Sequence, residues 1–268
     1  MRQLHLFGRL FALNVGVTFQ YRGEFLIMQI GNLIVPITSL LVWQAALASG
    51  APLPVDGEFL VAYFLLVSVV GMLTASWTAF YLAASIRDGA LNRWLIRPAS
   101  THLDAVANNV GEKVVKLVII VPLIAALALL LGDRIALPSD AGRWLLFAVA
   151  VVLAAGMRLA LDIMIGSLAF WFEDVQGFIR ALAVITPVLS GAVVPLALMP
   201  PGIAAVTAVQ PFRFMLSYPM EVLLADPAGG PGGLTAGFAL QVGWLAVFVA
   251  GAAGVWRLGL RSYAAAGA

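Results

Sequence analysis

Two of the few charged residues in this chain stand close together in a long apolar stretch. Arg158 and Asp162 are four residues apart within residues 143–172, so on a helix they share a face and can neutralise each other. Isolated charges inside a membrane would cost on the order of a few kcal/mol each. The spacing therefore predicts an intramembrane ion pair, which either fixes helix packing or takes part in substrate passage or gating.

A second charged pair lies in a segment that is interrupted by prolines. Arg213 and Glu221 flank Pro211 and Pro219 within residues 200–225, a stretch too polar and too broken for an ordinary membrane span. We expect short re-entrant or interfacial helices here, on the outer side of the membrane. Arg213 and Glu221 are interpreted as solvated charges at its rim, with a functional role as the alternative.

No motif for catalysis or nucleotide binding occurs in the sequence. GxxxxGK[ST], HExxH and GxSxG are all absent, so a phosphate loop, a zinc-protease helix and a nucleophile elbow are not expected. The chain has no cysteine and only His5 and His102 as histidines, which makes a metal site improbable. We therefore expect no catalytic residue, no metal and no cofactor in this chain.

The composition indicates that lipid surrounds most of the polypeptide. Apolar residues make up 62% of the 268 residues and charged residues 10%, whereas soluble domains are about a quarter charged. The net charge is only +2, and no basic patch with interleaved aromatic residues suggests a nucleic-acid partner. The expected fold class is an all-α integral membrane protein.

The hydropathy pattern divides the chain into an N-terminal segment, residues 1–23, and one transmembrane domain, residues 24–268. Residues 1–23 form an amphipathic pattern typical of a helix in the membrane interface; a soluble helix on a partner, or the start of the first span, are the alternatives. Pro187, Gly191 and Pro195 predict that the fifth span is kinked or discontinuous. The expected spans cover about residues 25–48, 58–85, 102–131, 143–172, 178–199 and 234–256.

The distribution of the basic residues predicts the orientation. With six spans, most of the 15 Lys and Arg residues fall on the side of the two termini, and only Arg134, Arg143 and Arg213 fall on the other. The positive-inside rule then places both termini in the cytoplasm. Lys113 and Lys116 are expected below the membrane, at the beginning of the third span.

The connection after the second span is the most informative loop. Residues 86–97 can form a short helix with one apolar side, which suits docking into a groove on a partner; a basic loop resting on anionic lipid headgroups is the alternative. Glu173 and Asp174 mark a second turn on the same side. If these elements dock on a partner, the residues that would receive force from it are Ile86, Arg87, Asp88, Leu91, Arg93, Trp94, Glu173 and Asp174.

Three stretches resemble the permease subunits of the type-2 ATP-binding cassette (ABC) transporter family. They are IRDGALNRWLIRPAS after the second span, FWFEDVQGF after the fourth, and LSGAVVPLALMPPGIAAVTAVQPFRFMLSYPMEVLL. The resemblance implies that residues 86–97 are a coupling helix on an ATPase subunit and that residues 1–22 are a connecting helix. It also implies two ATPase subunits, which hold ATP and Mg²⁺, and a second permease chain, identical or homologous but unlike.

The function expected from this resemblance is ATP-driven export of an amphipathic, lipid-like or drug-like substrate across a bacterial inner membrane. A membrane-embedded enzyme acting on lipid is one alternative, but it would need a cluster of polar side chains near one interface. A non-transporting membrane scaffold is the other alternative. Co-purification of an ATPase chain would favour the transporter over both.

Overall fold

The computed structural model describes residues 2–95, 101–131, 137–224 and 233–263, and within these ranges all regular secondary structure is helical. The expected all-α class is confirmed. The elements are α1 (Arg2–Gln20), α2 (Arg22–Ala48), α3 (Gly57–Thr74), α4 (Thr78–Arg87), α5 (Asn92–Leu95), α6 (Thr101–Leu131), α7 (Ala141–Gly166), η2 (Ser167–Phe170), α8 (Gln176–Leu189), η3 (Leu196–Leu198), α9 (Pro201–Val209), α10 (Pro211–Met215), α11 (Ser217–Leu224) and α12 (Gly233–Ser262).

Four helical stretches among the described residues are long and apolar enough to cross a membrane: Gly23–Ala48, Gly57–Arg87, Ala141–Phe170 and Gly233–Ser262. The other two expected spans correspond to α6, whose side chains are described only in part, and to α8. With 14 residues, α8 is about 21 Å long, shorter than a hydrocarbon core of about 30 Å. The chain continues beyond it as turns and the short 3₁₀ helix η3.

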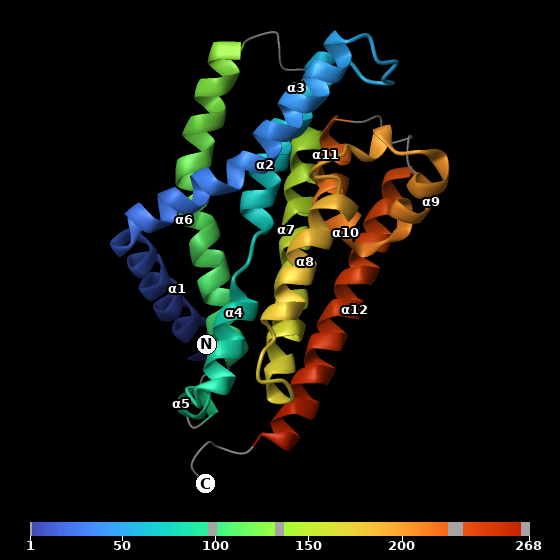
Figure 1. The fold of residues 1–268 in the computed structure, drawn as a ribbon. Coiled ribbons are helices and arrows are strands. Elements are labelled where there is room, and N and C mark those ends of the chain that lie inside the picture. Colours follow the sequence, from blue (N-terminus) through green and yellow to red (C-terminus); the bar gives the residue numbers. More distant parts are fainter. Residues whose placement is uncertain (1, 96–100, 132–136, 225–232, 264–268) are drawn as a thin grey trace.

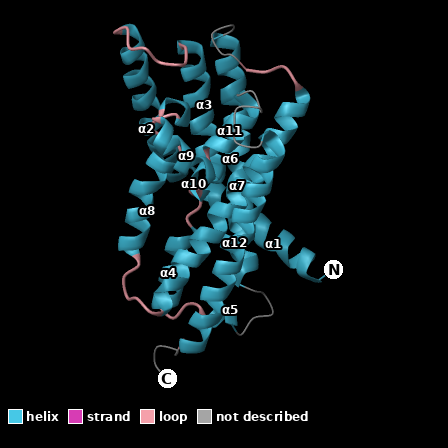
Figure 2. Ribbon diagram, turned by 90° about the vertical axis from the view of Figure 1, so that its right-hand side faces the viewer, coloured by secondary structure: helices cyan, strands magenta, loops and turns pink. Residues whose placement is uncertain are grey.

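Helices α6, α7, α8 and α12 run roughly along one long direction, whereas α1 and α2 are oblique to it (Figure 1). One end of the molecule, which we call the α5 end, carries α5, the C-terminal end of α12 and the connection into α8 (Figures 1 and 2). The opposite end carries the connection from α2 to α3. Helix α7 packs against α12, α11, α4 and α3. It therefore links the two ends of the helix bundle.

The second expected span is broken. Helix α3 ends at Thr74, Ala75 adopts an extended conformation with ψ of 144°, and α4 begins at Thr78. About 27 Å of helix separates this break from Gly57, so it lies nearer the α5 end. The hydropathy of residues 58–85 did not predict it, because the residues at the break are not prolines and remain part of an apolar stretch.

The N-terminal helix α1 packs against the first half of α6. A side chain at Gly111 of α6 would contact Asn14 and Val15 of α1, and Asn108 donates a hydrogen bond to the Asn14 carboxamide oxygen (3.1 Å). Leu13 remains exposed on another face of α1. One side of α1 is thus covered by protein, while the rest of the helix exposes both apolar residues such as Leu13 and polar residues such as Arg9, a mixture that suits the membrane interface.

Candidate functional site

Charged side chains from α6 surround the break between α3 and α4. Lys116 is 1% exposed, pairs with Glu112 one turn away (2.6 Å), and donates to the backbone oxygen of Met72 (2.9 Å). Lys113 donates to the backbone oxygen of Ala75 (3.2 Å) and to Asn109. The two ammonium groups therefore satisfy carbonyls that the end of α3 leaves without helical partners.

A buried carboxylate, opposite in sign to Lys113 and Lys116, lies at the start of α4. Arg158 and Asp162 of α7 form the expected ion pair, with 3.0 Å between Nε and Oδ1. Asp162 is buried and lies next to the Ser76 side chain and the backbone of Ala79. Cations at the C-terminal end of α3 and a carboxylate at the N-terminal end of α4 both complement the dipoles of these helices.

We refer to Glu112, Lys113, Lys116, Arg158 and Asp162, together with Asn109 and Ser76, as the break cluster. Sequence reasoning identified only the Arg158–Asp162 pair. Lys113 and Lys116 were assigned to the cytoplasmic start of the third span, because a hydropathy profile does not reveal that a neighbouring helix breaks at their level. The pattern Glu112, Lys113 and Lys116 at the edge of an apolar stretch was the available signal.

Helix α4 also packs closely against α7. A Cβ atom at Gly166 would lie 3.0 Å from the backbone oxygen of Ala79 and 3.0 Å from Leu82 Cβ. A Cβ atom here would be in tighter contact than is usual, so α4 would have to shift to accommodate any side chain. Gly166 therefore allows the beginning of α4 to pack closely against α7, the helix that carries Asp162.

We expect Gly166→Ala to lower the free energy of unfolding by about 1–3 kcal/mol, because the new methyl group forces α4 away from α7. Equilibrium unfolding of the purified protein in mixed micelles measures this change. Gly243→Ala is the matched control, since a Cβ atom at Gly243 meets no atom within 4 Å. Equal effects of the two substitutions would contradict the close α4–α7 contact.

The segment expected to receive force from a partner lies at the α5 end and is not one helix. Helix α4 ends at Arg87, Gly89 has a φ of 71°, and the Leu91 amide donates to the Ser85 oxygen (2.9 Å). This is a glycine-terminated helix end, followed by α5. The expected helix over residues 86–97 is therefore divided at Asp88–Leu91, and its residues 96–97 lie outside the described part of the chain.

The side chains of this segment divide into anchors and exposed charges. Ile86 and Leu91 are buried in a cluster with Leu82, Ile163 and Trp256. Trp94 packs against the same cluster from a half-buried position. Arg87, Asp88 and Arg93 are exposed, and Arg87 pairs with Asp88 (3.2 Å).

The apolar side chains thus hold the segment to α7 and α12, while its charges face outward.

The second expected turn lies at the same end of the molecule. Glu173 and Asp174 are exposed, and the Asp174 carboxylate accepts a hydrogen bond from the Gln176 amide (2.7 Å) at the start of α8. The preceding η2 packs against α4 and α12. Phe170 of η2 contacts Trp256 of α12, with 5.4 Å between ring centroids. Both turns are therefore joined through one aromatic and aliphatic core at the α5 end.

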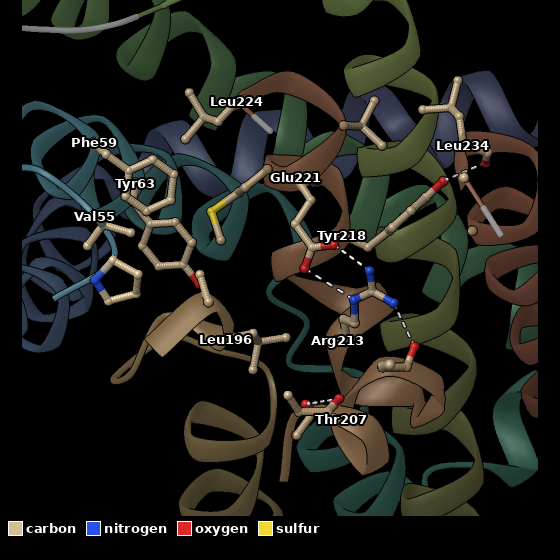
Figure 3. Close-up of a pocket in the computed structure, with 18 of the residues that line it drawn as sticks. Val55, Phe59, Tyr63, Leu196, Thr207, Arg213, Tyr218, Glu221, Leu224 and Leu234 are labelled. Atoms are coloured by element: carbon tan, nitrogen blue, oxygen red, sulfur yellow. Dashed lines mark hydrogen bonds and ion pairs between the residues drawn. The ribbon is translucent and has the colours of Figure 1, made fainter. Parts of the chain in front are cut away.

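A cavity of about 600 Å³ lies toward the opposite end, between α3, η3, α9, α10, α11 and α12 (Figure 3). The charged pair of the proline-rich segment lines it. Arg213 forms a two-pronged ion pair with Glu221, with 3.1 Å between Nε and Oε1, and also donates to the Ala208 oxygen (2.6 Å). Arg213 is buried, so the expectation that both charges are solvated at a rim is not met for Arg213.

The glutamine side chain of Gln210 explains how the short helices of this region are held. Its Oε1 atom accepts the Phe212 amide at the start of α10 (2.7 Å), and its Nε2 atom donates to the Leu189 oxygen at the end of α8 (2.7 Å). Proline at position 211 occupies the first turn of α10, where its missing N–H has no cost. The segment is thus ordered by polar capping contacts.

A comparison with protein families finds a match for most of this chain. The family model described as "ABC-2 family transporter protein" matches residues 55–267, which include the break cluster, both turns at the α5 end and the cavity lining apart from Pro54. No curated protein matches the chain.

Proposed function

Since this chain belongs to the ABC-2 family of transporter proteins, we propose that it forms half of the path of an ATP-driven exporter for amphipathic molecules. Membership makes it a multi-pass membrane permease subunit that associates with ABC ATPase subunits. In the proposed complex, two ATPase subunits hold ATP and Mg²⁺. A second permease chain, identical or homologous but unlike, completes the path in a bacterial inner membrane, with both termini in the cytoplasm.

The arrangement of residues 86–95 is the observation that carries this proposal. Leu91 is 0% exposed and Ile86 is 5% exposed, so the segment is fixed to the bundle. Arg87, Asp88 and Arg93 remain exposed at the α5 end. A segment with buried apolar side chains on one side and exposed charges on the other can bind a partner and transmit the partner's movement to the helix bundle.

The movement of residues 86–95 would be transmitted through the contacts of α4. Residues 86 and 91 lie in one cluster with residues of α7 and α12, so a displacement of the segment is transmitted to α4 and to both of these helices. The break at Ala75–Trp77 separates α4 from α3. Because a break absorbs changes in backbone angles, α4 can move while α3 stays in place. The break cluster would then stabilise the alternative positions of α4.

Glu173 and Asp174 are proposed as the second contact with an ATPase subunit, and α1 as the connecting helix in the membrane interface. The exposed Leu13 and Val17 of α1 support an interfacial position, because lipid is the solvent that favours such a face. The Arg158–Asp162 pair is proposed to fix the packing of α7 on the break rather than to contact substrate, since Asp162 is 4% exposed.

The test of the proposed function is a charge reversal at Arg93 in the complex of permease and ATPase subunits. We expect Arg93→Glu to reduce substrate-stimulated ATP hydrolysis on the order of tenfold, because the exposed charge at the ATPase contact changes sign. Stimulated ATPase activity and transport are measured on the purified, reconstituted complex.

The matched control is Arg261→Glu, which makes the same charge change on an exposed residue near the end of α12. We expect it to leave coupling intact. Unchanged coupling in Arg93→Glu would remove the assignment of residues 86–95 to the ATPase contact. Failure of any ATPase chain to co-purify with the native protein would favour the scaffold.

A further inference from the structure

The cavity at the end opposite α5 has the features of a ligand site, and we propose that it binds amphipathic organic cations, with Glu221 as the counter-ion. This inference names a substrate class for the transporter and to that extent rests on the proposed function. Binding itself requires only the permease chain.

The size and walls of the cavity suit a molecule of drug or lipid-headgroup dimensions. Its volume of about 600 Å³ lies within the usual range of small-molecule sites, about 300–1,000 Å³. Apolar side chains make most of the wall, and the charged side chains of Arg213 and Glu221 lie together on one side of it (Figure 3). A ligand with an apolar body and one polar group matches this division. The apolar wall includes Val55, Leu196, Ala204, Met220, Leu234 and Leu240.

The charge that a ligand meets in this cavity is negative. The side chain of Arg213 is 9% exposed and that of Glu221 is 29% exposed. All three nitrogens of the Arg213 guanidinium donate to Glu221 or to the Ala208 oxygen, and the group lies 5.3 Å and 5.7 Å from the Phe214 and Tyr218 ring centroids. Arg213 is therefore engaged, whereas the Glu221 carboxylate retains acceptor capacity.

Two further features on the other side of the cavity favour a cation. Phe59 and Tyr63 of α3 line it with stacked rings, 5.7 Å apart between centroids, and aromatic faces attract cations. Asp56 is exposed and also lines the cavity, so the part of the lining that the structure describes contains two carboxylates and one guanidinium. An anion would meet a surplus of negative charge and an arginine that already has its partners.

The experiment compares two probes of the same shape and opposite charge. Tetraphenylphosphonium and tetraphenylborate are each titrated into the purified full chain in detergent, with protein-free micelles as the blank. We expect the phosphonium to bind the wild-type chain at least about tenfold more tightly than the borate, because Coulomb interactions reverse sign with the probe. Equal or tighter binding of the borate would overturn the proposal.

Two variants locate the charge responsible. Glu221→Gln is expected to weaken phosphonium binding about tenfold. Asp56→Asn is expected to weaken it about two- to threefold, because that carboxylate is exposed and screened. Asp56 also caps α3 by accepting the Phe59 amide (2.7 Å), and asparagine caps equally well, so this variant tests charge in a chain whose fold is preserved.

Thermal unfolding of Glu221→Gln shows whether the chain with an unpaired Arg213 is folded. Unchanged phosphonium affinity in both variants would overturn the proposal. The Arg93→Glu variant separates this inference from the proposed function, since it should bind phosphonium like the wild type while losing coupling. If phosphonium does not bind but Arg93→Glu abolishes coupled ATP hydrolysis, the cation site is wrong and the transport function stands.

Discussion

The Lys116→Met variant is expected to lose about 3–5 kcal/mol of unfolding free energy, a large part of the stability of most proteins. Lys116 is buried, and its ammonium group bonds to Glu112 and to the backbone oxygen of Met72. Methionine has a similar volume but no donor. The substitution therefore leaves a largely buried carboxylate without its counter-charge and a helix-end carbonyl without its hydrogen bond.

A double substitution separates the cost of the unpaired Glu112 carboxylate from the cost of the unsatisfied Met72 backbone oxygen. Glu112→Met in combination with Lys116→Met removes both charges, and replacing a buried ion pair by apolar side chains is often neutral or stabilising. We expect the double variant to recover most of the loss, with the remainder reporting the unsatisfied Met72 oxygen. Equilibrium unfolding in mixed micelles gives the four free energies of the cycle. A double variant as unstable as Lys116→Met would contradict the pairing.

Leu91→Ala is expected to reduce the unfolding free energy by about 2–5 kcal/mol and also to weaken coupling. Leu91 is 0% exposed and packs with Ile86, Ile163 and Trp256, so its truncation leaves a cavity beneath the exposed charges of the segment. A segment that moves independently of α7 and α12 cannot pass force to them. Unfolding in mixed micelles and substrate-stimulated ATP hydrolysis of the complex measure the two effects.

The control for Leu91→Ala lies four residues further along the same segment. Leu95 is 46% exposed, and Leu95→Ala is expected to change stability by less than about 0.5 kcal/mol. Both variants remove the same atoms, so a difference between them reports the anchoring of Leu91. If Leu91→Ala lowers stability but leaves substrate-stimulated ATP hydrolysis unchanged, residues 86–95 stabilise the fold but do not transmit movement from the ATPase subunit.

These expectations connect two regions that are distant in sequence. Helix α4 begins next to Asp162 in the break cluster and ends at Arg87, immediately before the exposed charges of the α5 end. Gly166 allows it to lie directly against α7 between these points. A movement imposed at the α5 end therefore reaches the break cluster through one short helix of 10 residues.

Particular residues show how much of the site could be predicted. The four-residue spacing of Arg158 and Asp162 was sufficient for their ion pair, because helical geometry alone determines which side chains share a face. The polarity of residues 86–97 identified the segment at the α5 end. Gly89 was the unused signal that this segment would divide, since glycine is the residue that most readily ends a helix in the left-handed conformation.

The sequence by itself determined the class of this protein and the location of its polar elements. Hydropathy and periodicity are properties of each segment, so they can be read without knowledge of any neighbour. The break at Ala75–Trp77, the burial of Lys116 and the cavity around Glu221 were decided by the tertiary structure alone. Each depends on contacts between helices far apart in the chain, and at the break the lysine side chains of α6 satisfy the backbone of α3.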